Sequence, residues 1–395
     1  MNEDEWDDIY TQIARELLQN KSNNVINKDL YFKTATKLID AINGGLETTY
    51  YDSSSSKNIL SQYLKHNIYS FSAAKSLTEM LHFRNLMISE NGTILNFASF
   101  KAKIANDGFA FNNSFLKTEY NTAFQSAIMA HKWNTLDSDY LEYSTVGDKR
   151  VRDEHKALDK LTLHKSSPVW KRIWTPNGFN CRCTIVPGLK QNVKLTDAEA
   201  GALGKKAVTN PLFDNNVGIS RIIFNESHPY FINTSGKIQQ LNYEQYGLEP
   251  LAKIQTDYNL YRWNDSTKEE YYNWWKDNSD SNENIILGDF FGNEILFSKR
   301  FKNHINDNVD EHRYKYGKEL KTIIENPDEI WSSIDPKNKE LNTFYLKYYE
   351  PKNNNKTGVI TVFVKEDKAH SMYEIDTEKR LKEIRRGSLQ YTSKK

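Results

Sequence analysis

The segment Ile285-Ile-Leu-Gly-Asp-Phe-Phe-Gly-Asn-Glu-Ile-Leu-Phe297 decides the fold class of the C-terminal part of the chain. Its two apolar runs enclose a short segment of Asp, Gly and Asn, a pattern typical of a β-hairpin. A helical pattern follows over residues 301–324, and Glu340–Tyr349 and Gly358–Val364 then alternate like antiparallel strands. A helix followed by a small antiparallel sheet predicts an α+β domain of about 110 residues.

The residues before this domain have the periodicity of helices. Apolar residues recur at helical spacing from about residue 6 to residue 105, and Gly44-Gly45 is expected to end the second helix of this region. Another amphipathic helix is expected over Phe115–Trp133. The polar run Asp277–Asn284 is the expected domain boundary. The sequence therefore predicts a multidomain α+β protein in four parts: residues 1–80, 81–190, 191–284 and 285–395.

Composition excludes several classes of protein. A chain of 395 residues is expected to form two or three domains, and 13% aromatic residues can support packed cores. Because 53 Lys and Arg balance 52 Asp and Glu, a globally basic nucleic-acid protein is excluded, although local basic patches are not. We find no apolar run long enough for a transmembrane helix and no secretory signal. Two cysteines cannot build a disulfide framework, so we expect synthesis in a reducing cytoplasm.

The middle of the chain contains a dense set of polar residues. Cations far outnumber acids between Lys149 and Lys190, which predicts a local basic patch. Arg150 and Arg152 would share one face of an extended segment, where they could clamp a phosphate or a carboxylate. The alternative is a structural cluster of ion pairs. We expect one polar network that holds the segment Asn180-Cys-Arg-Cys183, formed by Asp148, Arg150, Arg152 and His155.

Three of these residues are also potential zinc ligands. His155, Cys181 and Cys183 could supply three ligands, with Asp148 as a fourth. However, a Cys-x-Cys pair is less usual in tetrahedral zinc sites than Cys-x₂-Cys. The alternative is that the cysteines are small buried hydrophobic residues and that the histidine satisfies a local hydrogen bond. We therefore expect no cofactor and retain zinc as the alternative.

The spacing of these residues, together with Leu158, Pro176 and Gly178, resembles the phage Mu gpF-like (MuF) minor head proteins, also called head-morphogenesis proteins. The resemblance covers roughly residues 80–190. It implies a structural component of the phage or prophage virion, inside the head or near the portal. Portal and capsid proteins are the implied partners, with synthesis in the bacterial cytoplasm and no membrane association.

The C-terminal part contains the candidate catalytic residues. His304 and His312 are eight residues apart, so they would share one face of a continuous helix, and Tyr316 would extend that row. A second basic segment lies near the end of the chain, whereas His370 is expected in a loop. The candidate catalytic residues are His304, His312, Arg313, Tyr316, Arg386 and Tyr391. The candidate phosphate-binding residues are Lys299, Arg300 and Lys318.

These residue types suit RNA cleavage without a metal ion. That reaction needs a base for the 2′-hydroxyl proton, an acid for the leaving 5′-oxygen and cations around the phosphorane. This part of the chain has no acidic cluster suited to magnesium. Because the pKa of an ordinary histidine lies near working pH, we expect His304 to be the base, Arg313 to stabilise the phosphorane and the product to be a 2′,3′-cyclic phosphate.

The order of elements resembles the nuclease modules grouped as phage barnase–EndoU–colicin E5/D–RelE-like (PBECR). The matching elements are the His304 helix, Tyr316, the segment from Asn326 to Trp331, the sheet and Arg386-Gly-Ser-Leu-x-Tyr391. The resemblance implies a barnase/RelE-like fold and an endoribonuclease toxin or effector, with RNA as substrate and an immunity protein as a further partner. The alternative is a purely structural capsid-associated protein whose C-terminal domain binds nucleic acid or a partner without catalysis. A third class, the ADP-ribosyltransferases, lacks support because no Arg, S-T-S and E-x-E set is present.

Overall fold

The computed structural model describes residues 4–19, 26–48, 55–234, 237–307, 312–352 and 357–393. The chain divides into two compact units, and the second consists mainly of the residues from Lys237 onward. No helix within the described ranges is long and apolar enough to cross a membrane. Because the main segment of the second unit begins at Lys237, the expected connecting region, residues 191–284, is divided between the two units.

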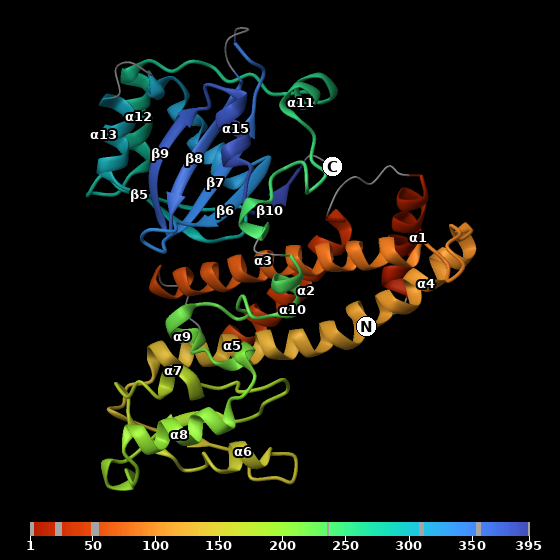
Figure 1. Ribbon diagram of the computed structural model, residues 1–395. Coiled ribbons are helices and arrows are strands. Elements are labelled where there is room, and N and C mark those ends of the chain that lie inside the picture. Colours follow the sequence, from red (N-terminus) through yellow and green to blue (C-terminus); the bar gives the residue numbers. More distant parts are fainter. Residues whose placement is uncertain are drawn as a thin grey trace. The chain divides into compact units, whose positions relative to one another are not determined.

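Long helices form the N-terminal part of the first unit (Figure 1). They are α1 (Asp4–Leu18), α2 (Lys28–Glu47), α3 (Ser55–Leu86), α4 (Phe97–Phe109) and α5 (Leu116–Thr135), with the π-helical segment η1 (Ala110–Phe115) before α5. The predicted helical region is confirmed, but the predicted helix end at Gly44-Gly45 is wrong. A Cβ atom at Gly45 would lie 2.5 Å from the carbonyl oxygen of Phe124, so this glycine allows α2 and α5 to pack closely.

A buried polar network fixes α3 against the chain around α5. The Lys75 ammonium group donates to the Glu119 carboxylate at 2.6 Å and to the Phe111 carbonyl oxygen at 2.7 Å. Lys75 is fully buried, and burial raises the pKa of the neighbouring Glu79 to about 7. Because a buried charge is tolerated only with its partner, these contacts specify how the helices align.

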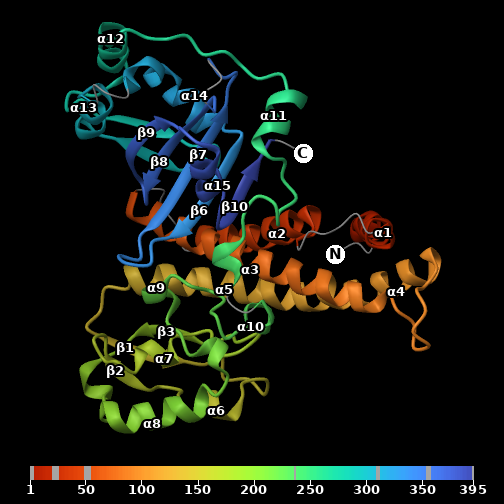
Figure 2. The same cartoon turned by 45° about the horizontal axis from the view of Figure 1, so that its top comes forward.

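After α5, the first unit contains a small antiparallel sheet with short helices around it (Figure 2). Its strands, in the order β2-β1-β3, are β1 (Tyr140–Ser144), β2 (Thr162–His164) and β3 (Thr184–Pro187). The helices are α6 (Asp153–Lys156), α7 (Trp170–Ile173), α8 (Asp197–Ala207), α9 (Val217–Ser220) and α10 (Pro229–Asn233), with the 3₁₀ turns η2 (Lys190–Asn192) and η3 (Pro211–Phe213). Tyr143, Trp170 and Trp174 form the centre of its hydrophobic core.

The second unit contains a seven-stranded sheet in the order β10-β6-β7-β8-β9-β5-β4. The strands are β4 (Ile285–Gly288), β5 (Glu294–Phe297), β6 (Glu329–Ile334), β7 (Leu341–Tyr348), β8 (Val359–Lys365), β9 (Lys368–Glu374) and β10 (Ser388–Thr392). Neighbouring strands are antiparallel except for β5 and β9, which are parallel. The predicted hairpin over residues 285–297 and the predicted antiparallel pair β7–β8 are confirmed, as is the α+β fold class.

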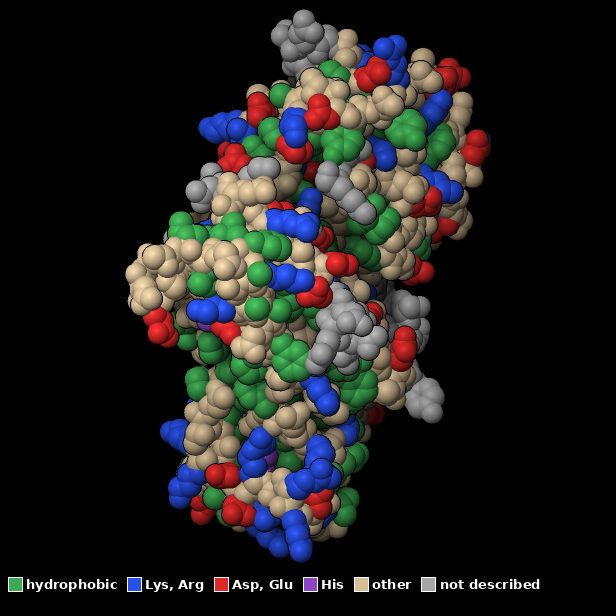
Figure 3. Space-filling view, turned by 90° about the vertical axis from the view of Figure 1, so that its right-hand side faces the viewer, with side chains coloured by type: hydrophobic (Ala, Val, Ile, Leu, Met, Phe, Trp, Pro, Cys, Tyr) green, Lys and Arg blue, Asp and Glu red, His purple; other side chains and the backbone are tan. Residues whose placement is uncertain are grey.

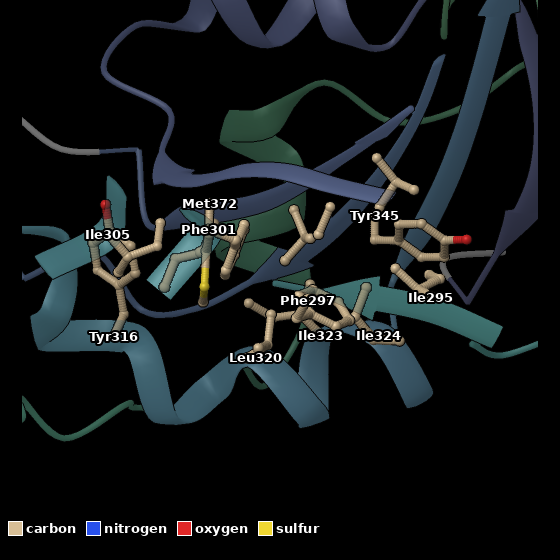
Figure 4. Packing of buried hydrophobic residues seen from close by; sticks show 14 of the residues in the cluster. Ile295, Phe297, Phe301, Ile305, Tyr316, Leu320, Ile323, Ile324, Tyr345 and Met372 are labelled. Carbon is tan, nitrogen blue, oxygen red and sulfur yellow. The ribbon is translucent and has the colours of Figure 1, made fainter. Parts of the chain in front are cut away.

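Helices cover this sheet and complete its core. They are η4 (Lys237–Gln240), α11 (Leu251–Asp257), α12 (Lys268–Asn278), α13 (Lys299–Asp307), η5 (Arg313–Glu319), α14 (Leu320–Glu325) and α15 (Glu378–Ile384). Apolar side chains of α13 and α14, among them Phe301 and Ile323, point toward Tyr345 and Met372 of the strands (Figure 4). Tyr271 and Trp275 of α12 belong to the same core, so residues before the expected boundary at 284/285 pack within this unit.

The single helix predicted over residues 301–324 is wrong. Helix α13 ends at Asp307, and His312, the next described residue, has a left-handed backbone with φ of 47°. A 3₁₀ turn then precedes α14. Gly317 in this turn lies so close to Tyr271 that a Cβ atom would come within 2.3 Å of its ring. The segment Arg313–Glu319 therefore packs against α12 as a 3₁₀ turn and not as part of one continuous helix.

A buried ion pair joins β6 to the end of α15. Arg385 donates to both carboxylate oxygens of Glu329, at 2.9 and 2.8 Å, and the Trp331 indole N–H donates to the same carboxylate at 2.7 Å. Arg385 also donates to the Glu249 carbonyl oxygen at 2.9 Å and lies over the Tyr243 ring. The side chains of Arg385 and Glu329 are almost completely buried, so neither charge has water to replace its partner.

Replacing this carboxylate should loosen the sheet edge at β6 and β10. Because Glu329→Gln leaves Arg385 buried without its counter-charge, we expect the free energy of opening of these strands to fall by about 3–5 kcal/mol. Hydrogen exchange of the full chain, followed by mass spectrometry, measures that quantity locally. Glu325→Gln is the control because Glu325 forms an exposed pair with Lys321, worth about 0–1 kcal/mol. Equal effects of the two changes would contradict the argument.

Candidate active site

His304, Arg313 and Ser371 form a hydrogen-bonded cluster beside β9. The Arg313 Nη1 atom lies 2.9 Å from His304 Nε2 and 2.8 Å from Ser371 Oγ, and His304 Nε2 lies 3.2 Å from Ser371 Oγ. His304 is exposed, whereas Arg313 is only 9% exposed. Tyr373 supports the buried guanidinium, whose carbon lies 5.6 Å from the centre of its ring.

The chemistry of the guanidinium group determines the direction of its hydrogen bond with His304, and with it the tautomer of the imidazole. Arg313 can only donate hydrogen bonds, so His304 Nε2 accepts and the ring proton is assigned to Nδ1. In this tautomer the basic nitrogen of the imidazole is directed at the group that would also attract a phosphate. This arrangement combines a base and a phosphate-binding cation within hydrogen-bond distance of each other.

His304 also lines a pocket of about 300 Å³. The pocket is formed by Leu296, Ser298, Arg300, Phe301, His304, Lys368, Ala369 and His370. None of the described residues that line it is acidic, and Arg300 and Lys368 bring positive charge to it. Burial, reinforced by the charge of Lys365, lowers the pKa of His370. The pocket thus offers cations and two imidazoles to an anionic ligand.

Two of the predicted catalytic residues lie outside this cluster. Tyr316 is buried in the hydrophobic core, where its hydroxyl oxygen accepts from the Glu374 backbone N–H at 3.1 Å and its ring packs against Trp263. His312 is exposed, and its Nδ1 atom lies 3.4 Å from the Tyr314 hydroxyl oxygen. The row of residues predicted from eight-residue spacing does not form because the helix ends before His312.

Of the three predicted phosphate-binding residues, Arg300 lines the pocket. Lys299 instead pairs with Glu283 at 2.6 Å, and Lys302 pairs with the same carboxylate at 2.7 Å. These two lysines lower the pKa of Glu283 to about 2. Lys318 lies 3.7 Å from the Glu270 carboxylate. Both Lys299 and Lys318 therefore have acidic partners away from the His304 cluster.

The remaining two predicted residues belong to the other end of the sheet. Tyr391 lies on β10, packs against Phe290 with ring centres 4.0 Å apart, and lines a second pocket of about 590 Å³ with Asp328 and Lys347. Arg386 is exposed just before the same strand. Four strand spacings of about 4.8 Å separate β10 from β9, or about 19 Å in all. The structure does not bring Arg386 or Tyr391 to His304.

Sequence reasoning missed three residues near His304. Ser371, Lys368 and His370 all come from β9, and the loop predicted for His370 is wrong. The available signal for a strand was weak, because the alternation of polar and apolar residues in Lys368-Ala-His370 breaks at Ser371. It could not reveal that this strand lies next to α13, because that contact joins residues 67 positions apart.

The polar residues of the middle region converge on the segment that contains the two cysteines. Arg182 donates to both Asp148 carboxylate oxygens at 2.7 Å, and this interaction lowers the pKa of Asp148 to about 2. Arg152 donates to the Phe179 carbonyl oxygen at 2.8 Å. Asn180 has φ of 57°, and its side-chain oxygen accepts from the Asn121 amide at 3.1 Å.

His155 lies 3.8 Å from each cysteine sulfur, measured from its Nδ1 atom. Asp148 is engaged by Arg182, so the structure does not place it beside the cysteines as a fourth ligand. Arg150 is exposed and approaches Asp148 at 4.0 Å. Of the four residues expected to hold the segment Asn180–Cys183, Asp148 and His155 therefore contact it, Arg152 contacts the preceding residue Phe179, and Arg150 contacts Asp148 instead. Lys and Arg side chains gather at the lower end of Figure 3, where Figure 1 places α6 and α8.

Arg152 should stabilise the cysteine segment more than Arg150 does. Its guanidinium contacts the Phe179 carbonyl oxygen and lies against Gly178, but it remains exposed, so we expect Arg152→Ala to cost about 0.5–1.5 kcal/mol. The matched control Arg150→Ala should change stability by less than about 0.5 kcal/mol. Hydrogen exchange over residues 178–183 measures both. Unchanged exchange in Arg152→Ala would favour a binding role for this arginine.

Comparison with known proteins identifies two regions of the chain. Residues 91–186 match the family model described as Phage Mu protein F like protein, and residues 276–392 match phage-Barnase-EndoU-ColicinE5/D-RelE like nuclease2. The chain is 32% identical over 71 residues to the Mu-like prophage FluMu F protein of Haemophilus influenzae and 36% identical over 75 residues to the putative capsid assembly protein F of Escherichia phage Mu.

Each of these alignments covers 18% of this chain and 17% of the relative, so the chain spans only a small part of the curated relatives it matches. No solved structure matches the chain. The family matches agree with the two resemblances seen in the sequence. Residues 91–186 are thus similar to the phage Mu protein F-like family, and residues 276–392 are similar to the phage barnase–EndoU–colicin E5/D–RelE-like nucleases.

Proposed function

We propose that this protein is a virion-associated minor head protein of a phage or prophage whose C-terminal domain is an endoribonuclease. The domain cleaves RNA without a metal ion and leaves a 2′,3′-cyclic phosphate. The observation that carries this proposal is the cluster of His304, Arg313 and Ser371 at a cationic pocket without acidic lining residues among those described. The match to the nuclease family supports the same reading.

The first half of the reaction uses the contact between His304 and Arg313. An incoming phosphodiester competes with His304 for the Arg313 guanidinium. When the phosphodiester binds the guanidinium, His304 Nε2 can accept the 2′-hydroxyl proton. The 2′-oxygen then forms a bond to phosphorus, and Arg313, Arg300 and Lys368 balance the charge of the phosphorane. Ser371 holds the guanidinium in place through its 2.8 Å hydrogen bond.

The second half requires an acid for the leaving 5′-oxygen. His370 lines the same pocket as His304, and the negative charge of a bound phosphate opposes the effects that lower its pKa in the free protein. Protonated His370 gives its proton to the 5′-oxygen as the bond from phosphorus to that oxygen breaks. The products are a 2′,3′-cyclic phosphate and a free 5′-hydroxyl, and the two imidazoles have exchanged protonation states.

The virion role rests on the Mu F-like region. One relative with sequence similarity there is named a putative capsid assembly protein, which supports capsid and portal proteins as partners. A position inside the head or near the portal, an RNA substrate and an immunity protein that blocks the pocket complete the proposal. The alternative, a C-terminal domain that binds nucleic acid or a partner without cutting, makes the opposite prediction in the assays below.

Removal of the proposed base should slow RNA cleavage by the full chain. In EDTA, we expect His304→Ala to cleave RNA about 10²–10⁴-fold more slowly than the wild-type protein because a positioned general base contributes that factor. His164→Ala is the control, since His164 is an exposed imidazole whose partner is Ser166. Mass spectrometry of the RNA ends identifies the cyclic phosphate. Cleavage that requires magnesium, or a fully active His304→Ala protein, would refute the mechanism.

The role of His370 can be separated from that of His304 by the leaving group. A 5′-bridging phosphorothiolate linkage releases a thiolate, which departs without a proton and therefore needs no general acid. We expect His370→Ala to be slow on ordinary RNA and close to the wild-type rate on the phosphorothiolate RNA, whereas His304→Ala should be slow on both. Equal losses of His370→Ala on both substrates would exclude the acid role.

A further inference from the structure

The cluster of His155, Cys181 and Cys183 lies in the Mu F-like region, away from the chemistry proposed for the nuclease domain. Its three potential ligand atoms lie within 4.8 Å of one another, and all three side chains are buried. The exposed fractions are 2% for His155, 4% for Cys181 and 6% for Cys183. Two thiols and an imidazole therefore converge in the interior of the same small domain.

The distances match those of a tetrahedral metal site. With zinc bonds of about 2.3 Å to sulfur and 2.0–2.1 Å to nitrogen, a sulfur and a nitrogen on neighbouring corners lie about 3.6 Å apart. The His155 Nδ1 atom lies 3.8 Å from the sulfur of Cys181 and 3.8 Å from that of Cys183. A small inward movement of each side chain would bring all three atoms to bonding distance of one ion.

The backbone holds these ligands in position from two separate segments. His155 lies in the short helix α6, while the cysteines lie just before β3, after the left-handed turn at Asn180. The Arg182 interaction with Asp148 and the Arg152 interaction with the Phe179 carbonyl oxygen fasten the second segment to the first. These contacts act as the outer support that orients the ligands of a metal site.

The domain around these ligands has little regular secondary structure, so a bound metal ion would stabilise it. Its three strands contain only five, three and four residues, and much of the chain between β1 and β3 is irregular. Small domains with little regular structure commonly depend on a metal or a disulfide for stability. Two thiolates and a neutral imidazole form a borderline-soft ligand set, which suits zinc better than calcium or magnesium.

We propose that His155, Cys181 and Cys183 bind a structural zinc ion that joins α6 to the segment before β3. Solvent completes the tetrahedron in place of the fourth protein ligand. The ion balances the charge of the two thiolates, and the proton of each thiol is released when the metal binds. This proposal is independent of the nuclease mechanism because its ligands belong to the other compact unit.

Metal analysis of the full chain tests the proposal directly. The wild-type protein, purified under reducing conditions, should contain one zinc ion per chain, whereas Cys181→Ser and Cys183→Ser should lose it. The control His164→Ala keeps its zinc, because that exposed imidazole lies on β2 and contacts Ser166. Removal of zinc with a strong chelator should lower the melting temperature of the wild-type protein and leave that of Cys181→Ser unchanged.

A second measurement needs no variant and so remains decisive if the serine proteins fail to fold. Cobalt(II) added to the chelator-stripped wild-type chain should produce the thiolate-to-metal charge-transfer absorption of a tetrahedral site. Wild-type protein without zinc and without this absorption would overturn the proposal and leave a buried thiol–imidazole cluster. Zinc retained by both serine variants would also overturn it, since the metal would then be bound elsewhere.

Discussion

The buried pair of Glu329 and Arg385 is the constraint on which the architecture of the second unit depends. It joins β6 to the end of α15, and the Arg385 backbone carbonyl also accepts a hydrogen bond from the Tyr243 N–H. Separated in a dry interior, either charge would be several kcal/mol less stable, so alternative registers of β6 and β10 are strongly disfavoured. A sheet whose C-terminal strand is fixed this firmly keeps β7, β8 and β9 in one arrangement.

Local patterns revealed β4, β5, β7 and β8 of this unit, but not β6, β9 or β10 and not the 3₁₀ turn between its helices. Alternating residues from Leu341 to Tyr348 and apolar runs around Ile285 show which face of a strand is buried, and this information is local. The 3₁₀ turn Arg313–Glu319 packs against α12 through the close approach of Gly317 to Tyr271, a contact between elements distant in the sequence. The parallel pairing of β5 with β9 is non-local in the same way.

The candidate site shows the same division between local and distant information. His304 and Arg313 are nine residues apart, and their chemistry was recognisable from residue type, whereas the row predicted from the eight-residue spacing of His304 and His312 does not form. Charge counting could not show that Lys299 is occupied by Glu283, nor that Arg386 lies at the opposite end of the sheet. Positive residues can be counted in a sequence, but the field at a site depends on where their acidic partners lie.

The parts of the site are encoded far apart, and this separation affects when it can work. His304 and Arg313 are translated before Lys368, His370 and Ser371, which belong to β9. A nascent chain that does not yet include β9 therefore contains the His304 imidazole and the Arg313 guanidinium but lacks the strand that completes the pocket. The complete pocket can therefore exist only after β9 has been translated.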